Sequence, residues 1–139
     1  MSVFIFFTGK TSLLDLLTGA AAPTSGHVRR HPGAVITLLQ QHHYKGDQLN
    51  PDLSPLDHLR LLPFSDRTVI GVYDLGTRQE ETAHRSYLSN LGLVGPRAVI
   101  PVKYLSGGQK MRVALAVALY KRPDVLILDE VTAIQFLTI

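Results

Sequence analysis

The segment near the end of the chain constrains the fold more than any other. It runs from Leu105-Ser106-Gly107-Gly108-Gln109 through an apolar stretch to Tyr120, and then through the aliphatic run Val125 to Leu128 into Asp129-Glu130. An apolar stretch that follows glycines and ends before basic residues and a proline predicts a buried helix. An aliphatic run that ends in carboxylates predicts a buried parallel strand with acids at its carboxyl edge. Together they indicate an α/β fold.

Two further apolar runs extend this pattern toward the N-terminus. Val3 to Phe7 is aromatic and β-branched without alternation, which predicts a strand buried on both faces. Leucines from Leu13 to Leu17 predict a short helix that ends at Gly19. Ala34 to Gln40, bounded by turn residues, predicts a second strand. We therefore expect strand, helix and strand in the first third of the chain.

The middle of the chain is predicted to be helical. Ser54 followed by Pro55 indicates a helix start, and the helix is expected to stop near Leu62-Pro63. Thr77 to Glu80 has the spacing of a capping box, and apolar residues recur every four positions until Gly92. The order of elements predicts a helical insertion between strands of one sheet.

Composition excludes several classes of protein. With 139 residues, 45% hydrophobic and 18% charged, the chain is expected to form one globular unit and not a disordered one. The absence of cysteine excludes disulfides and thiolate zinc sites, and the apolar runs are too short to predict a membrane span. The net charge of +3 suits nucleotides or RNA. Four basic candidates lack interleaved aromatics, which favours a solvated surface: Arg29, Arg30, Lys103 and Lys110.

Gly9-Lys10-Thr11 lies between the first predicted strand and helix. In that context the tripeptide is the second half of a phosphate loop, in which amides, an ammonium and a hydroxyl meet phosphate and Mg²⁺. The first half is missing, because Phe4 occupies the position where the pattern requires glycine. Alone, the tripeptide is also compatible with a plain helix start carrying a surface lysine.

The chain resembles the ATP-binding cassette (ABC) family. Leu105 to Gln109 matches the family's signature motif at all five positions, and Asp124 to Glu130 matches its Walker B strand with the adjoining glutamate. The resemblance implies a parallel sheet of P-loop NTPase type with an inserted helical subdomain that contains the signature helix. It places residues 1–41 and 122–132 in the core sheet and about 50–121 in the helical subdomain.

The resemblance also implies roles for individual residues, with ATP and Mg²⁺ as cofactors. Glu130 would activate the attacking water and Gln41 would assist at the metal, with Gln40 as the alternative to Gln41. Mg²⁺ would be held by Thr11, Gln41 and Asp129. The nucleotide-binding residues would be Gly9, Lys10, Thr11 and Ser12 for one ATP, and Ser106, Gly107, Gly108 and Gln109 for an ATP on the opposite cassette.

Within the family, the chain looks most like the F subfamily of soluble tandem cassettes. The similarity lies in Gln41-His42-His43 and in Leu53-Ser54-Pro55-Leu56. It implies a cytoplasmic protein associated with translation, paired with a second cassette in cis or as a dimer, with the ribosome as a further candidate partner. Adjacent His42 and His43 are poorly spaced for one metal ion, so solvated loop histidines are favoured over ligands.

Both ends depart from the family pattern. The phosphate loop lacks its first glycine, Val131 stands where the family usually has proline, and the expected D-loop does not follow Thr132. These departures predict a truncated cassette. The alternative function is therefore a catalytically inactive cassette that acts, if at all, as a partner-binding or ribosome-binding module.

Overall fold

The protein contains a three-stranded parallel sheet. The computed structural model describes residues 3–7, 11–40, 49–62 and 76–129. Strands β1 (Val3–Phe7), β2 (Ile36–Gln40) and β3 (Val125–Asp129) lie in the order β1-β3-β2, and both pairings are parallel. The last of the described strands in the sequence is therefore the central one. The predicted α/β fold with a parallel sheet is confirmed.

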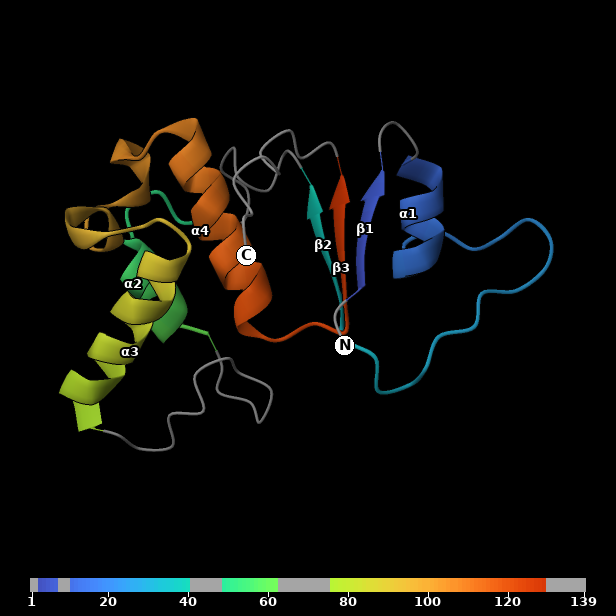
Figure 1. Cartoon of the computed structure of the whole chain (residues 1–139). Helices are drawn as coiled ribbons and strands as arrows, with labels where there is room; N and C mark the ends of the chain where they lie inside the picture. The colour runs from blue at the N-terminus through green and yellow to red at the C-terminus, as the bar shows by residue number, and fades with distance from the viewer. Residues whose placement is uncertain (1–2, 8–10, 41–48, 63–75, 130–139) are drawn as a thin grey trace.

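Both faces of β3 are buried. Leu126 and Leu128 belong to the main core cluster, whereas Ile127, which is equally buried, lies outside that cluster. Alternate residues of a strand point to opposite faces, so the two faces meet different elements. Helix α1 (Thr11–Thr18), with the fully buried Leu14, flanks the sheet on the side away from the other helices (Figure 1). An aliphatic run without alternation is what such a strand requires.

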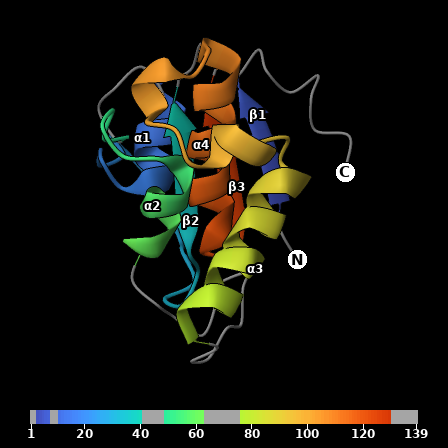
Figure 2. The ribbon, with the colours of Figure 1, turned by 90° about the vertical axis from the view of Figure 1, so that its left-hand side faces the viewer.

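Helix α4 (Gly107–Tyr120) lies between the sheet and the remaining helices. Figures 1 and 2 show α2 (Pro55–Arg60) and α3 (Gly76–Asn90) on the far side of α4. Two short 3₁₀ helices, η2 (Gly95–Ala98) and η3 (Val102–Tyr104), lead into α4. The helix is buried along most of its length, through Met111, Val113, Ala114, Leu115, Ala116, Ala118 and Tyr120. This explains why its sequence is apolar nearly all round.

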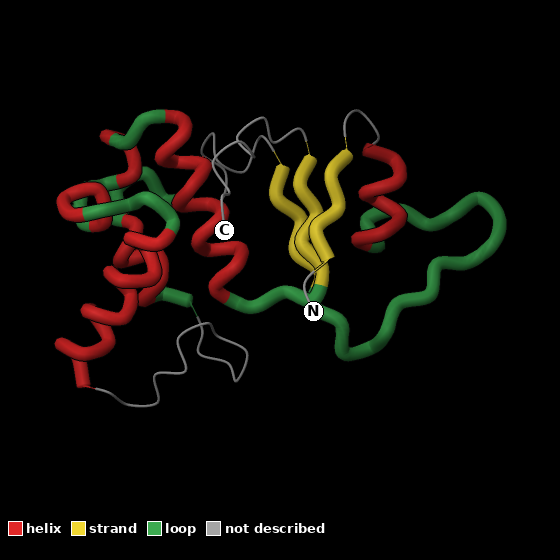
Figure 3. The backbone as a smooth tube through the Cα atoms, viewed as in Figure 1, coloured by secondary structure: helices red, strands yellow, loops and turns green. Residues whose placement is uncertain are grey.

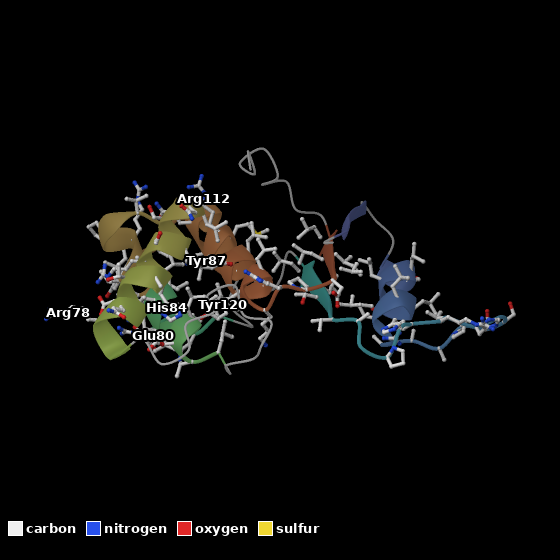
Figure 4. All side chains as sticks on the ribbon, turned by 60° about the horizontal axis from the view of Figure 1, so that its bottom comes forward. Arg78, Glu80, His84, Tyr87, Arg112 and Tyr120 are labelled. Atoms are coloured by element: carbon white, nitrogen blue, oxygen red, sulfur yellow. The ribbon has the colours of Figure 1, made fainter. Side chains whose placement is uncertain are left out.

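An aromatic cluster joins α3 to α4, as Figure 4 shows. His84 Nε2 and Tyr120 Oη are 2.8 Å apart, and the Tyr87 hydroxyl donates a 2.8 Å hydrogen bond to the carbonyl of Ala116. The rings of Tyr87 and Tyr120 meet edge to face, with centroids 5.7 Å apart. Burial raises the pKa values of both tyrosines, so both hydroxyls stay protonated and available as donors.

The connection from α1 to β2 is a long exposed loop, drawn in green in Figure 3. Gly19 adopts a φ of 84° directly after α1, so it ends the helix as predicted. The Arg30 guanidinium donates a 2.8 Å hydrogen bond to the carbonyl of Thr18, at the helix C-terminus. This bond ties the later part of the loop to the end of α1.

Three predicted boundaries differ from the structure. β2 begins at Ile36 and not at Ala34, because the backbone of Val35 is bound to Asp124 instead of continuing the strand. α3 already includes Gly76, so the prediction that Thr77 caps this helix was wrong. α2 ends at Arg60, and a turn closed by the amide of Leu62 completes the predicted span.

Candidate functional site

The carboxyl edge of the sheet gathers the ends of all three strands. In the parallel register, Asp129 is opposite Phe7 on one side and Gln40 on the other. Helix α1 begins at Thr11, and its first turn lies at the same edge in Figure 1. Ligands of open parallel sheets bind at this edge. The topology therefore brings the start of α1 at Thr11 and the end of the central strand at Asp129 to the same edge of the sheet.

Several predicted site residues cannot be placed. Gly9, Lys10, Gln41 and Glu130 lie outside the described residues, as do His42 and His43. The structure describes Thr11 and Asp129 as the first residue of α1 and the last of β3, without their side chains, and Ser12 is exposed. The roles expected of these residues stay predictions.

A second group of predicted residues is described completely, at the start of α4. Ser106 is the N-cap, and its hydroxyl oxygen accepts a 3.3 Å hydrogen bond from the amide of Gln109. In return, the Gln109 side-chain oxygen accepts a 2.9 Å bond from the amide of Ser106. This capping box fixes the first turn of the helix and leaves the O–H proton of Ser106 free to donate.

The first residues of α4 with its cap, Ser106, Gly107 and Gly108, form what we call the α4 mouth, and it is open to solution. Ser106, Gly107 and Gly108 are exposed, and within the described residues the two glycine amides have no hydrogen-bond acceptor. A Cβ built on either glycine would meet nothing within 4 Å. Leu105, only 5% exposed, anchors the chain just before the cap. Free amides at the positive end of a helix, beside a hydroxyl, are the donor set that a phosphate group requires.

The nearest lysine before this mouth is already paired. Lys103 Nζ lies 2.8 Å from Asp52 Oδ1, and this hydrogen bond raises the pKa of Lys103. The same ammonium lies 5.3 Å from the ring centroid of Tyr104, which is 70% exposed. The helix terminus can therefore attract an anion without relying on Lys103.

The two candidate phosphate sites of one chain lie on different sides of the sheet. Figure 1 places α1 on one side and α4 on the other, with both helices beginning toward the carboxyl edge of the strands. Ser12, at the start of α1, therefore does not share one site with Ser106. The starts of α1 and α4 therefore lie on separate surfaces.

Sequence reasoning missed one side chain that holds the sheet together. Asp124 Oδ2 accepts a 2.8 Å hydrogen bond from the amide of Val35, across 89 positions of the sequence. The turn before it contains Arg122, whose φ of 46° is uncommon for a residue other than glycine. A carboxylate directly before an aliphatic strand was the available signal, but its partner is not visible in the local sequence.

The described part of the chain contains neither a clustered metal site nor a helix that could span a membrane. No group of three or more histidine, aspartate or glutamate side chains in this part of the chain is arranged to hold a metal ion. None of its helices combines the length and apolarity needed to span a membrane.

Comparison with known proteins gives strong sequence matches. The family model described as "ABC transporter" matches residues 8–133. "ATP-binding cassette sub-family F member 2" of Bos taurus is 38% identical over 89% of this chain and 18% of its own length. "ABC transporter F family member 3" of Arabidopsis thaliana is 37% identical over 88% and 15%, and "Probable ATP-binding protein YheS" of Escherichia coli K12 is 34% identical over 89% and 17%. The chain thus spans less than a fifth of the length of these relatives.

Solved structures show the same fold. A post-hydrolysis dimeric structure of the ATP-binding cassette MJ0796, bound to ADP and Pi, superposes with a TM-score of 0.62 at 18% identity, over 96% of this chain and 67% of that one. An inward-facing ABC transporter superposes with a TM-score of 0.60 at 21% identity, over 93% and 49%. These likenesses agree with the parallel sheet and its flanking helices. The chain belongs to the ABC transporter family of ATP-binding cassettes.

Proposed function

We propose that the chain binds ATP with Mg²⁺ and hydrolyses it as an F-type cassette, with each nucleotide sandwiched between two cassettes. The observation that carries this proposal is the open, capped N-terminus of α4, where Ser106, Gly107 and Gly108 present unused donors. Such preorganised donors stabilise the negative charge of a transferring phosphoryl group.

At the sheet edge, we assign the residues that bind the near side of the nucleotide, which is the side held by the cassette that carries it. Thr11 begins α1, where helix amides face an anion, and Gly9, Lys10 and Ser12 adjoin it in the sequence. Asp129 ends the central strand opposite Gln40. Bound Mg²⁺ would neutralise phosphate charge, and we assign Thr11, Asp129 and Gln41 to hold it. Glu130, which follows Asp129, is assigned to accept the proton of the attacking water.

The separation of α1 and α4 supports the sandwich. One chain presents its two phosphate-binding surfaces on different sides of its sheet, so a nucleotide that uses both needs a second cassette, in cis or as a dimer (Figure 1). The solved cassette MJ0796 is described as dimeric and bound to ADP and Pi. We accordingly assign Gln109 and the residues of the α4 mouth to the nucleotide of the facing cassette. The same assignment divides the chain into a core sheet, 1–41 and 122–132, and a helical subdomain, about 50–121.

The F-type part of the proposal is supported by two relatives whose names contain "sub-family F" and "F family". A soluble, cytoplasmic protein that works with the ribosome would follow from that assignment. Retention on ribosomes that survives high salt would support it, because a nonspecific charge contact is lost as salt rises.

One observation favours the inactive alternative. β1 continues through Phe7, so three residues separate the strand from the start of α1 at Thr11. The position where the phosphate-loop pattern requires its first glycine, Phe4, lies inside the strand. A cassette that has lost this loop would retain the α4 surface without nucleotide turnover.

Titration of the full chain with Mg-ATP, beside Lys10→Ala and Glu130→Gln, separates the two functions. We expect saturable binding that is lost in Lys10→Ala, and turnover that is lost in Glu130→Gln while binding is kept. Absence of binding by a folded wild-type chain would contradict the proposed function and favour the inactive cassette.

A further inference from the structure

The start of β2 is held by a side chain, directly after a turn in which the amide of Ala34 donates to the carbonyl of His31. The amide of Val35 donates a 2.8 Å hydrogen bond to Asp124 Oδ2, and the carbonyl of Val35 accepts from the amides of Asp124 and Val125 at 2.8 and 3.2 Å. Both backbone polar groups of Val35 are therefore bound to the first residues of the central strand. The bond from Val125 is the first bond of the β2–β3 ladder, and the two bonds with Asp124 form a two-point clamp directly before it.

Besides this clamp, the burial of Leu39 bears on the register of β2. The loop before it is exposed from residue 19 to residue 33. Among the described side chains of the strand, Leu39 is buried, whereas Ile36, Thr37 and Leu38 are half-exposed. A shift by one residue would turn Leu39 out of the core, and a shift by two residues would bring Thr37 or Gln41 to its buried position, so the burial of Leu39 opposes both shifts. Leu39 therefore favours the observed register toward one end of the strand, and the contact between Val35 and Asp124 lies at the other end.

The register decides what lies opposite Asp129. With Ile36 beside Val125, Gln40 is beside Asp129 at the carboxyl edge. A shift by two residues would move Gln40 by about 6.6 Å along the strand, since parallel strands rise about 3.3 Å per residue. A displacement of that size exceeds the reach of a metal ligand, whose bonds to oxygen are about 2.0–2.6 Å long.

We propose that Asp124 is a positioning residue, which sets the register of β2 against β3 through Val35 and so places the glutamine end of β2 opposite Asp129. The inference rests on the proposed function, because it gives the metal site as the reason for the register. Asp124 acts at the amino end of the sheet, a full strand length from the residues that it positions. The left-handed Arg122 and the buried Pro123 shape the turn that presents its carboxylate to Val35.

Two readouts on the full chain test this role. Backbone proton contacts between β2 and β3, measured by nuclear Overhauser spectroscopy, report the register directly. The Mg²⁺ concentration at half-saturation of ATP binding reports its consequence. In Asp124→Ala we expect the Gln40 to Asp129 contacts to weaken or shift, and the Mg²⁺ requirement to rise about tenfold, as for other residues that orient metal ligands.

Three matched variants separate positioning from simple loss of stability. Asp124→Asn keeps an oxygen acceptor for the Val35 amide, so we expect wild-type contacts and a Mg²⁺ requirement within about twofold of wild type. Tyr87→Phe removes a hydrogen bond in the helical layer, and it should lower the unfolding temperature without changing either readout. If Asp124→Ala does not fold, Asp124→Glu replaces it, because the extra methylene displaces the acceptor and should shift the contacts.

The outcomes distinguish this inference from the proposed function. Wild-type contacts and a wild-type Mg²⁺ requirement in folded Asp124→Ala or Asp124→Glu would overturn the role of Asp124. A wild-type chain that does not bind Mg-ATP would instead contradict the proposed function, and the contacts between β2 and β3 would then decide by themselves whether Asp124 sets the register.

Discussion

Helices α2 and α4 both begin with a serine capping box, but the two caps differ in burial and in hydrogen bonding. Each starts with a serine N-cap and a capping box, Ser54 with Asp57 in α2 and Ser106 with Gln109 in α4. Ser54 is 5% exposed, and its hydroxyl donates a 2.6 Å hydrogen bond to Asp57 Oδ2. Ser106 is exposed, and its proton has no acceptor among the described residues.

The residues around each cap account for the difference. At α2, His58 Nδ1 is 2.9 Å from the carbonyl of Ser54, and His58 Nε2 accepts a 3.0 Å bond from the amide of Asn50. Leu56, in the first turn, is buried at 3% exposure. At α4, glycines occupy the corresponding positions and open the amides to solution. The buried cap of α2 thus stabilises the fold, whereas the exposed cap of α4 is available for a ligand.

The largest expected effects come from placing a carboxylate in each first turn. Gly108→Asp puts a negative charge where the proposal has a phosphate, so we expect turnover to fall at least about a hundredfold. The helix terminus accommodates the carboxylate, and the unfolding temperature should stay the same or rise slightly. Turnover assays and thermal unfolding of one preparation check both. A large loss of stability without a specific loss of turnover would show that the α4 mouth is structural.

Leu56→Asp is the counterpart in α2, and it should affect stability alone. The aspartate would be buried without a partner, so we expect a loss of at least about 3 kcal/mol in the free energy of unfolding, measured with urea. Nucleotide affinity per folded molecule should be unchanged. A Leu56→Asp chain with wild-type stability would contradict the account of the α2 cap.

Alanine at each capping serine gives an intermediate effect. Ser54→Ala should cost about 1–2 kcal/mol of stability, because it also removes the acceptor for the Asp57 amide in a buried cap, and it should leave turnover per folded molecule unchanged. Ser106→Ala should cost about 1 kcal/mol or less and reduce turnover about tenfold. Equal effects of the two variants on turnover would remove the distinction between the caps.

The buried His84 of α3 should also make the free energy of unfolding depend on pH. Burial lowers the pKa of His84 below its usual 6.5, Arg60 lowers it further, and Glu80 opposes the shift. The folded state therefore resists a proton that the unfolded state takes up. The contribution of neutral His84 to the free energy of unfolding is fully present above pH 6.5, and it is lost as the pH falls below that value. Urea unfolding between pH 5 and 7.5 should show this decline in the wild type and a weaker one in His84→Leu.

Asp52→Asn gives the smallest expected effect. It removes the ion pair with Lys103, and both side chains are largely exposed. Exposed pairs contribute little and are screened by salt, so the urea midpoint should move less than in any variant above. A shift as large as that of Ser54→Ala would show that this pair supports the α4 mouth.

The sequence predicted the elements better than their junctions. The strands Val3–Phe7 and Val125–Asp129 and the buried helix after Ser106 followed from apolar runs, and the start of α2 followed from Ser54 and Pro55, signals that act over a few positions. The start of β2 could not be predicted, because Val35 bonds to Asp124, a residue 89 positions away. The open state of the α4 mouth also depends on tertiary packing, since Ser54 and Ser106 are both preceded by a leucine and differ in what covers them.

The most direct test of the central claim is a complementation assay. Lys10→Ala disables the near side of each proposed site, and Gly108→Asp disables the facing side, so each variant alone should be inactive. If a nucleotide is shared between two chains, a 1:1 mixture contains mixed dimers with one intact site, and turnover should recover to about a quarter of the wild-type rate. A mixture as inactive as its components, while wild type turns over and the mixed dimer forms, would contradict the claim that α4 serves the nucleotide of a facing cassette.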